Sequence, residues 1–330
     1  MEEATTPHEE TPAPQPMNSQ QLMDIIQNST DYFERVEALK QINDQNLLAE
    51  IAKNDYDYYI KKSALEKITD IDLISDIAKN SYDYNLRIDA VKMLEDQEAI
   101  AWIAKNDQDY YVRQAAVENL LDQNILYEIA KNDDDHNVSR SAIHNLSDEK
   151  LLSELAKNAN DFYVRFESVK KISDIGLLVD VAKAARDFYV CKIAVSQITD
   201  QQKLFDIAQY AEDKDIRSLG LNMLTDQNLI AELARHGIDY YIVVDAIRKL
   251  ENDEVLYEIA RHDKDYYIRA IAVSRLEDEN RLIEIAKTDE DYYVRKEAVK
   301  RIKNQTVLNE IAESDADPDV RKEASSSIEE

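Results

Sequence analysis

The sequence predicts an all-α protein, a solenoid of about twelve stacked repeats of 26 residues. The first observation is an alanine that returns at a constant step of 26 residues: Ala52, Ala78, Ala104, Ala130, Ala156, Ala182, Ala208, Ala234, Ala260, Ala286 and Ala312. The second is an aspartate five residues beyond this position in every repeat: Asp31, Asp57, Asp83, Asp109, Asp135, Asp161, Asp187, Asp213, Asp239, Asp265, Asp291 and Asp317. The third is apolar spacing typical of amphipathic helices. Copies in register without insertions indicate one repeat architecture.

Each repeat is expected to hold two short helices, at about 45–54 and 58–68 in the second copy. The apolar residues of that copy follow helical spacing: Leu48, Ile51, Ala52, Ile60, Ala64, Leu65 and Ile68. A helix of about ten residues is marginal alone in water, because nucleation is costly. We therefore expect stacking of each helix pair on the next to supply the stability.

Aspartates stand just before both expected helices. Asp57 precedes the second helix of its repeat and Asp44 the first, where a carboxylate can accept hydrogen bonds from free backbone amides. Nine repeats have an aspartate before the first helix: Asp44, Asp70, Asp96, Asp122, Asp148, Asp174, Asp200, Asp226 and Asp278. With the twelve before the second helix, they make 21 of the 68 acidic residues, so much of the acidity is predicted to be structural.

Charge and composition exclude several classes of protein. The chain has 40 Lys and Arg against 68 Asp and Glu, a formal net charge of −28, whereas nucleic-acid binders need cations to neutralise phosphates. Its one cysteine, Cys191, can form no internal disulfide, which favours a reducing compartment. No basic-then-apolar amino terminus and no apolar run of about 18 residues occur. We expect a soluble cytoplasmic monomer that binds neither membranes nor nucleic acid directly.

Two regions are expected along the chain. Residues 1–18 hold four of the five prolines and several glutamates with no apolar pattern, so we predict a disordered Pro/Glu-rich tail. Residues 19–330 carry the repeats, and the closing segment, with Ser325 where other copies have an apolar residue, is expected to cap the array.

The segment from Asp315 to Ala324 reads D-A-D-P-D-V-R-K-E-A, and every repeat carries a variant of it. This string resembles the inter-helix signature of HEAT repeats, and the resemblance covers about residues 19–330. It implies a right-handed α-solenoid with the second helices on the concave face and an aspartate–arginine ladder between repeats. The ladder column would be Arg35, Lys61, Arg87, Arg113, Arg165, Arg217, Arg269, Arg295 and Arg321, with breaks at Ser139, Cys191 and Val243. The short period is also similar to leucine-rich-repeat-variant proteins, which leaves the first helix α or partly 3₁₀.

No enzymatic site is expected. Twelve equivalent acidic copies cannot each be an active site, and no phosphate-binding or nucleophile-elbow motif occurs. His236 and His262 lie one repeat apart, a separation of about 8 to 10 Å that is too long for one shared zinc ion. We therefore predict no catalytic residue, no metal and no cofactor.

Aromatic residues recur in two adjacent columns at the start of the second helices. The outward column contains Phe33, Tyr59, Tyr111, Tyr163, Tyr189, Tyr241, Tyr267 and Tyr293, and tyrosine rows are typical of interface hot spots. Copies seven to ten also place apolar residues where other copies are polar. The predicted partner site is Tyr189, Ile193, Leu219, Tyr241, Val244, Tyr267 and Ile271. The alternative for the apolar residues is burial by a local change in curvature.

These observations favour a non-enzymatic scaffold or adaptor that binds a protein or peptide on its second-helix face. The acidic surface favours a partner with a basic surface. The alternative function is an acidic nucleic-acid mimic that occupies a DNA- or RNA-binding protein. Its charge density disfavours this role, because −28 spread over about 100 Å is sparser than the phosphates of duplex DNA.

Overall fold

The computed structural model describes residues 17–329, and there it contains twenty-four helices and no strand. Two compact units divide the chain, the first ending at Ser147 and the second beginning at Asp148. The helices of the first unit are α1 (Ser19–Asn28), α2 (Tyr32–Gln41), α3 (Gln45–Asn54), α4 (Tyr58–Glu66), α5 (Ile71–Asn80), α6 (Tyr84–Val91), α7 (Gln97–Asn106), α8 (Tyr110–Glu118), α9 (Gln123–Asn132) and α10 (His136–Asn145).

The second unit holds seven more helix pairs. They are α11 (Glu149–Asn158), α12 (Phe162–Lys170), α13 (Ile175–Ala184), α14 (Phe188–Gln197), α15 (Gln201–Tyr210), α16 (Lys214–Met223), α17 (Gln227–His236), α18 (Tyr240–Lys249), α19 (Asp253–His262), α20 (Tyr266–Arg275), α21 (Glu279–Thr288), α22 (Tyr292–Val299), α23 (Gln305–Ser314) and α24 (Pro318–Glu329).

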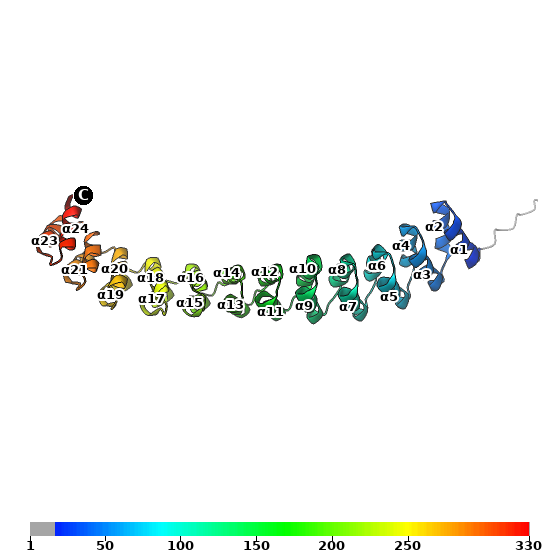
Figure 1. Cartoon of the computed structure of the whole chain (residues 1–330), viewed down its shortest axis with the longest axis horizontal. Helices are drawn as coiled ribbons and strands as arrows, with labels where there is room; N and C mark the ends of the chain where they lie inside the picture. Colours follow the sequence, from blue (N-terminus) through cyan, green and yellow to red (C-terminus); the bar gives the residue numbers. More distant parts are fainter. Residues whose placement is uncertain (1–16, 330) are drawn as a thin grey trace, which may run out of the picture. The chain divides into compact units, whose positions relative to one another are not determined.

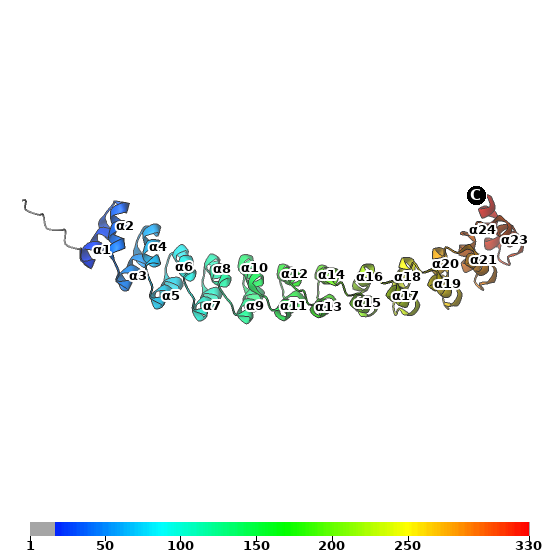
Figure 2. The ribbon, with the colours of Figure 1, turned by 180° about the vertical axis from the view of Figure 1, so that it is seen from behind.

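Odd-numbered helices, here named A helices, and even-numbered helices, named B helices, form two rows within each unit (Figures 1 and 2). The prediction of an all-α fold made of twelve helix pairs is confirmed. The A helices are α-helical, which resolves the choice between α and 3₁₀. Of the predicted tail, residues 1–16 lie outside the described residues, and Asn18 forms the N-cap of α1.

Side-chain caps start these helices as the aspartate columns predict. Asp57 accepts hydrogen bonds from the backbone amides of Tyr59 and Ile60, and Asp44 accepts them from Asn46 and Leu47. All nine aspartates predicted before A helices are N-caps: Asp44, Asp70, Asp96, Asp122, Asp148, Asp174, Asp200, Asp226 and Asp278. Asparagine takes this role in the three remaining repeats, at Asn18, Asn252 and Asn304.

Small residues set the distance between the two helices of a repeat. The recurrent alanines of the A helices face small residues of the B helices, and the pair in the second repeat, Ala52 and Ala64, has no solvent exposure. In the eighth repeat the B-helix position is Gly220, where an added Cβ would lie 2.8 Å from the backbone nitrogen of Ala208 and 3.0 Å from the carbonyl oxygen of Leu204. These helices are therefore too close for alanine without a backbone shift.

We predict that Gly220→Ala destabilises the protein, although alanine favours a helix by about 1 kcal/mol over glycine. Displacing packed backbone typically costs about 1 to 3 kcal/mol, which exceeds that gain. The measurement is denaturant unfolding. Gly176→Ala is the control, because Gly176 is exposed and an added Cβ would meet only the Asp174 carboxylate, 3.0 Å away. Equal effects of the two substitutions would contradict the packing explanation.

Candidate partner-binding site

The three tyrosines of the predicted site lie at the second position of their B helices and reach solvent. Tyr241 is 75% exposed, Tyr189 64% and Tyr267 40%. Each is held beside an N-cap carboxylate, because its own backbone amide donates to the aspartate two residues earlier; for Tyr241 the distance to Asp239 Oδ1 is 2.9 Å. The site thus places an aromatic ring and a carboxylate at the same end of each helix.

The four apolar residues of the predicted site do not form a continuous exposed strip. Val244 is 6% exposed and Ile271 is 8% exposed, so both are buried. Ile193 and Leu219 are half-buried. The prediction that Val244 and Ile271 occupy an open face is therefore wrong, and the alternative of burial holds for them.

For Ile271, at the sixth position of α20, the reason is the contact between neighbouring B helices, which is visible in α4 and α6; Val244 is at the fifth position of α18, and this contact does not account for its burial. The Tyr58 hydroxyl, at the first position of α4, donates a 2.6 Å hydrogen bond to Asp89, at the sixth position of α6. Burial and this bond to a carboxylate raise the pKa of Tyr58. The first position of one B helix therefore meets the sixth position of the next.

At two repeat boundaries of the second unit, both of these positions are apolar. Phe162 and Phe188 stand at first positions, and Ile193 and Leu219 stand at the sixth positions of the repeats that follow them. A phenylalanine has no hydroxyl to donate, so an apolar side chain replaces the aspartate. This matching accounts for the half-buried state of Ile193 and Leu219 by packing between neighbouring B helices.

The tyrosines of the site differ in the contacts that their rings make. Tyr267 stacks on Tyr293 of the next repeat, with centroids 6.4 Å apart and planes inclined by 17°. Tyr241 contacts its chain neighbour Tyr240 edge-on at 5.8 Å. In the first unit the ring centroids of Tyr110 and Tyr111 lie 4.0 Å apart. A side-chain hydrogen bond between the two residues raises the pKa of Tyr110 to about 12. Tyr241 therefore keeps most of its ring free, whereas Tyr267 is supported by a neighbour.

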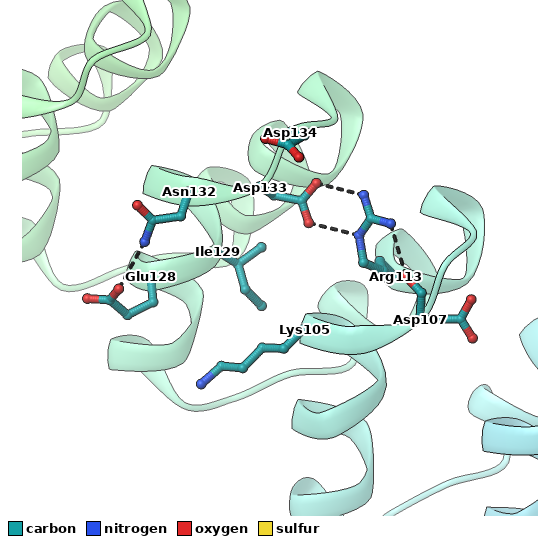
Figure 3. Close-up of a pocket in the computed structure, with 8 residues that line it drawn as sticks. All are labelled: Lys105, Asp107, Arg113, Glu128, Ile129, Asn132, Asp133 and Asp134. Atoms are coloured by element: carbon teal, nitrogen blue, oxygen red, sulfur yellow. Dashed lines mark hydrogen bonds and ion pairs between the residues drawn. The ribbon is translucent and has the colours of Figure 1, made fainter.

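The aspartate–arginine ladder implied by the HEAT resemblance is present, and Figure 3 shows one rung of it. Arg113 bonds both carboxylate oxygens of Asp133 at 2.9 Å, and its Nη1 donates to the carbonyl of Asp107 at 3.0 Å. Three other rungs of this bidentate kind join Arg87 to Asp107, Arg269 to Asp289 and Arg295 to Asp315. Arg35 also bonds both oxygens of Asp55, but through Nη2 alone, because its Nε donates to the carbonyl of Ile26. The acceptor is the aspartate two residues before the N-cap.

Where that acceptor is missing, the ladder changes partner. Position 185 is alanine and position 237 is glycine, so Arg165 and Arg217 bond the N-cap aspartates Asp187 and Asp239 instead, at 3.5 and 2.8 Å. The Nε atoms of both arginines are buried without a hydrogen-bond partner among the described residues. One residue in the following repeat thus decides whether a rung is complete.

At Cys191, where the arginine ladder was predicted to break, the side chain is a buried thiol. Cys191 is 3% exposed, and its Sγ lies 3.5 Å from the carbonyl oxygen of Ala185. Burial, with Asp213 and Asp187 nearby, raises the pKa of the thiol to about 11. A thiolate is therefore disfavoured at neutral pH, which supports a structural role for Cys191.

A second charge ladder runs along the A helices. Lys53 pairs with Asp76 of the next repeat, and Lys287 pairs with Glu310 at 2.7 Å. Sequence reasoning missed this connection between repeats. Its signal was the recurrence of both charges at a constant spacing of 23 residues.

The clefts between repeats are the spaces beside these ladders. The one in Figure 3 is lined by Lys105, Glu128 and the Arg113–Asp133 rung, and a similar cleft surrounds Arg269 and Asp289. Their recurrence indicates a consequence of stacking. Across residues 17–329 no group of three or more His, Cys, Asp or Glu side chains is arranged to hold a metal ion. None of the described helices combines the length and apolarity needed to cross a membrane.

Several solved structures are similar to this chain. No protein-family model matches the chain, and no curated protein matches it. A solved HEAT-like repeats protein from the archaeon Thermococcus onnurineus NA1 is similar, with 15% sequence identity over 87% of this chain and 96% of that chain, and a TM-score of 0.15. The features of this chain that resemble HEAT repeats are its helix pairs and its aspartate–arginine ladder.

We predict that Ala185→Asp stabilises the protein by about 1 kcal/mol, because it gives Arg165 the bidentate acceptor that complete rungs have. Thermal unfolding measures the gain. Ala211→Asp is the control, since the ladder position of the preceding repeat is Cys191 and that repeat offers no guanidinium to the new carboxylate. We expect that buried position to lose stability. Stabilisation by both substitutions, or by neither, would contradict the role of the acceptor.

The ladder carboxylates also predict how stability depends on pH. Burial acts to raise the pKa of Asp239, but backbone bonds and the Arg217 guanidinium outweigh it and hold this pKa below its ordinary value. Asp315 is shifted downward in the same way, by its bonds to Arg295 and to the backbone amide of Asp317. A lowered folded pKa stabilises the protein above the unfolded pKa of about 4, and this contribution is lost as pH falls through the folded value.

We therefore expect the free energy of unfolding to decrease as pH falls below about 4.5, measured by denaturant titration at several pH values. Arg217→Met is the test variant, because it removes one cause of the lowered pKa of Asp239. Its stability should be lower at neutral pH and should fall less steeply in acid. Parallel curves for the two proteins would show that the ion pair has no part in the effect.

Proposed function

We propose that this protein is a non-enzymatic scaffold that binds a protein or peptide through its B-helix face in the second unit. Tyr189, Tyr241 and Tyr267 are the anchors of the proposed site. Ile193 and Leu219 form its half-buried floor. Val244 and Ile271 are buried, so they contribute to packing rather than to direct contact with a partner.

One observation carries the proposal: large aromatic rings lie in solvent at equivalent positions of α14, α18 and α20. Tyr241 keeps three quarters of its surface exposed, although folding offers apolar surface a more favourable place inside. Tyrosine supplies a large contact area at low entropic cost, and truncating such anchors typically removes much of the binding energy.

Charge favours a basic partner. A lysine or arginine side chain could lie over the Tyr241 or Tyr267 ring while its cation approaches the adjacent N-cap carboxylate, Asp239 or Asp265. Val243 stands where other repeats have the ladder cation, so among the described residues Asp263 makes no ladder ion pair. The third predicted break thus leaves a carboxylate beside Tyr267 available to a partner.

The alternative of nucleic-acid mimicry gains nothing from the structure. A mimic needs free carboxylates that follow a phosphate path, whereas the recurrent aspartates here cap helices and bond ladder cations, as Asp57 and Asp133 do. These carboxylates already take part in the N-caps and ion pairs that stabilise the fold.

We predict that Tyr241→Ala with Tyr267→Ala weakens partner binding about thirtyfold or more, because truncated hot spots typically lose at least 2 kcal/mol. The partner is first captured with the full chain, then purified and titrated by calorimetry. Melting temperature should change little, since exposed side chains usually contribute within about 0.5 kcal/mol.

Tyr59→Ala with Tyr111→Ala is the matched control pair in the first unit. Tyr59 and Tyr111 are 67% and 50% exposed, and Tyr111 leans on neighbouring rings as Tyr267 does. The control pair should bind normally. Equal loss in both pairs would place the site elsewhere or spread it along the whole column, and unfolding of the central pair would show that its rings are core.

A further inference from the structure

One inter-repeat cleft of the first unit differs from its equivalents. It lies between the third and fourth repeats, has a volume of about 660 Å³, and is lined by residues that include Lys79, Asn80, Tyr82, Tyr84 and Trp102. Trp102 is the only tryptophan of the chain. The predicted partner site lies in the other unit, so nothing in the proposed function accounts for this cleft.

The difference is a loss of carboxylates. In the equivalent cleft of Figure 3, Glu128 and Asp134 stand where this cleft has Trp102 and Gln108. The replacement at position 102 also changes the A-helix ladder. Lys79 has no carboxylate there and lies over the indole ring instead, with Nζ 5.9 Å from the ring centroid. An acidic protein therefore has a local aromatic surface with a cation that makes no ladder ion pair within the described residues.

The aromatic side chains of the cleft are open to solvent. Tyr82 is 102% exposed, Trp102 49% and Tyr84 42%. The residue equivalent to Tyr82 in the preceding repeat, Tyr56, instead covers the guanidinium of Arg35, with 4.2 Å between the Arg35 Cζ and the ring centroid. Tyr82 thus occupies the same position as Tyr56, but Lys61 stands where Tyr56 has the guanidinium of Arg35, and the Tyr82 ring is left exposed.

We propose that this cleft binds the chain's own proline-rich segment, residues 1–16. Proline-rich chains dock in grooves lined by tryptophan and tyrosine, because their extended form loses little entropy on binding and proline rings pack flat on aromatic faces. The segment carries four prolines: Pro7, Pro12, Pro14 and Pro16. Its four glutamates, Glu2, Glu3, Glu9 and Glu10, complement Lys79 rather than the carboxylate-rich clefts elsewhere.

The length of the segment allows this contact. Sixteen residues at about 3.1 Å each reach roughly 50 Å in an extended proline-rich conformation. The segment joins the described chain at Met17, just before α1, and the cleft lies two to three repeats further along the same unit, about 20 to 30 Å at ordinary helix-packing distances. Docking in the same molecule therefore needs no movement between the units.

Trp102 gives a direct readout. The full chain is compared with a full-length variant carrying Pro12→Ser, Pro14→Ser and Pro16→Ser, by tryptophan emission and by acrylamide quenching. We expect the triple variant to emit at longer wavelength and to be quenched about twofold more strongly, because its indole is no longer covered. Adding a synthetic peptide of residues 1–16 to the triple variant should reverse both changes saturably.

Two single variants test the cleft itself. Tyr82→Ala, made in the triple variant, should weaken binding of the peptide about tenfold, as loss of an aromatic anchor typically does. Ile238→Ala is its control, since Ile238 occupies the equivalent position in the ninth repeat and is 72% exposed. Circular dichroism checks that each variant remains folded.

The proposal is overturned if the triple variant has the emission and quenching of the unchanged chain, or if the peptide fails to bind it. It is also overturned if quenching of the unchanged chain varies with protein concentration, since the segment would then come from a second molecule. Equal binding of the peptide by the Tyr82→Ala variant would place any docking outside this cleft.

Discussion

Helices of eight to twelve residues cannot hold themselves together in water, and the described chain contains no longer ones. Every other feature depends on how one pair packs on the next. The apolar columns of the A and B helices bury one another, and small residues such as Ala52 and Ala64 let the two helices approach. Polar connections fix the register between repeats. Two of them are the arginine ladder and the A-helix ladder. A third is formed by A-helix amides such as Gln45, whose side chain accepts a hydrogen bond from the backbone of Thr69 in the next repeat.

These connections explain why so acidic a protein can be stable. Repulsion among carboxylates opposes folding, but aspartates at N-caps interact favourably with the free amides and positive end of a helix. Ladder carboxylates such as Asp133 also face a guanidinium at 2.9 Å in a partly buried setting, where the interaction is stronger than on an open surface. Aspartate therefore caps helices, forms ion pairs between repeats and adds to the protein's negative charge, according to its position in the repeat.

Variation between copies is where function is to be sought, since a uniform column serves folding. Some departures accompany a change in a packed neighbour, as Leu219 accompanies Phe188. Others have no such explanation, above all the exposed rings of Tyr241 and Tyr82. The distinction matters because an aromatic residue that supports its neighbour is retained for stability, whereas one left in water is free to bind.

The period, the helix pairs and the caps could be predicted from the sequence because they are local. An N-cap depends on residues two or three positions away, and an apolar stripe depends on the 3.6-residue turn of one helix. Exposure on the B-helix face could not be predicted in this way. The helical spacing of α18 predicts which of its side chains face its own A helix, but it does not predict the burial of Val244.

The same limit applies to the ladder. The arginine column was visible in the sequence, whereas the completeness of each rung depends on position 185 or 237 of the following repeat, which is near only after the pairs have stacked. The tertiary structure alone decided that Val244 and Ile271 are buried, that Tyr241 is free and that Arg165 lacks part of its acceptor. The physical reason is that these properties depend on the rotation and distance between successive helix pairs, and not on the turn of any single helix.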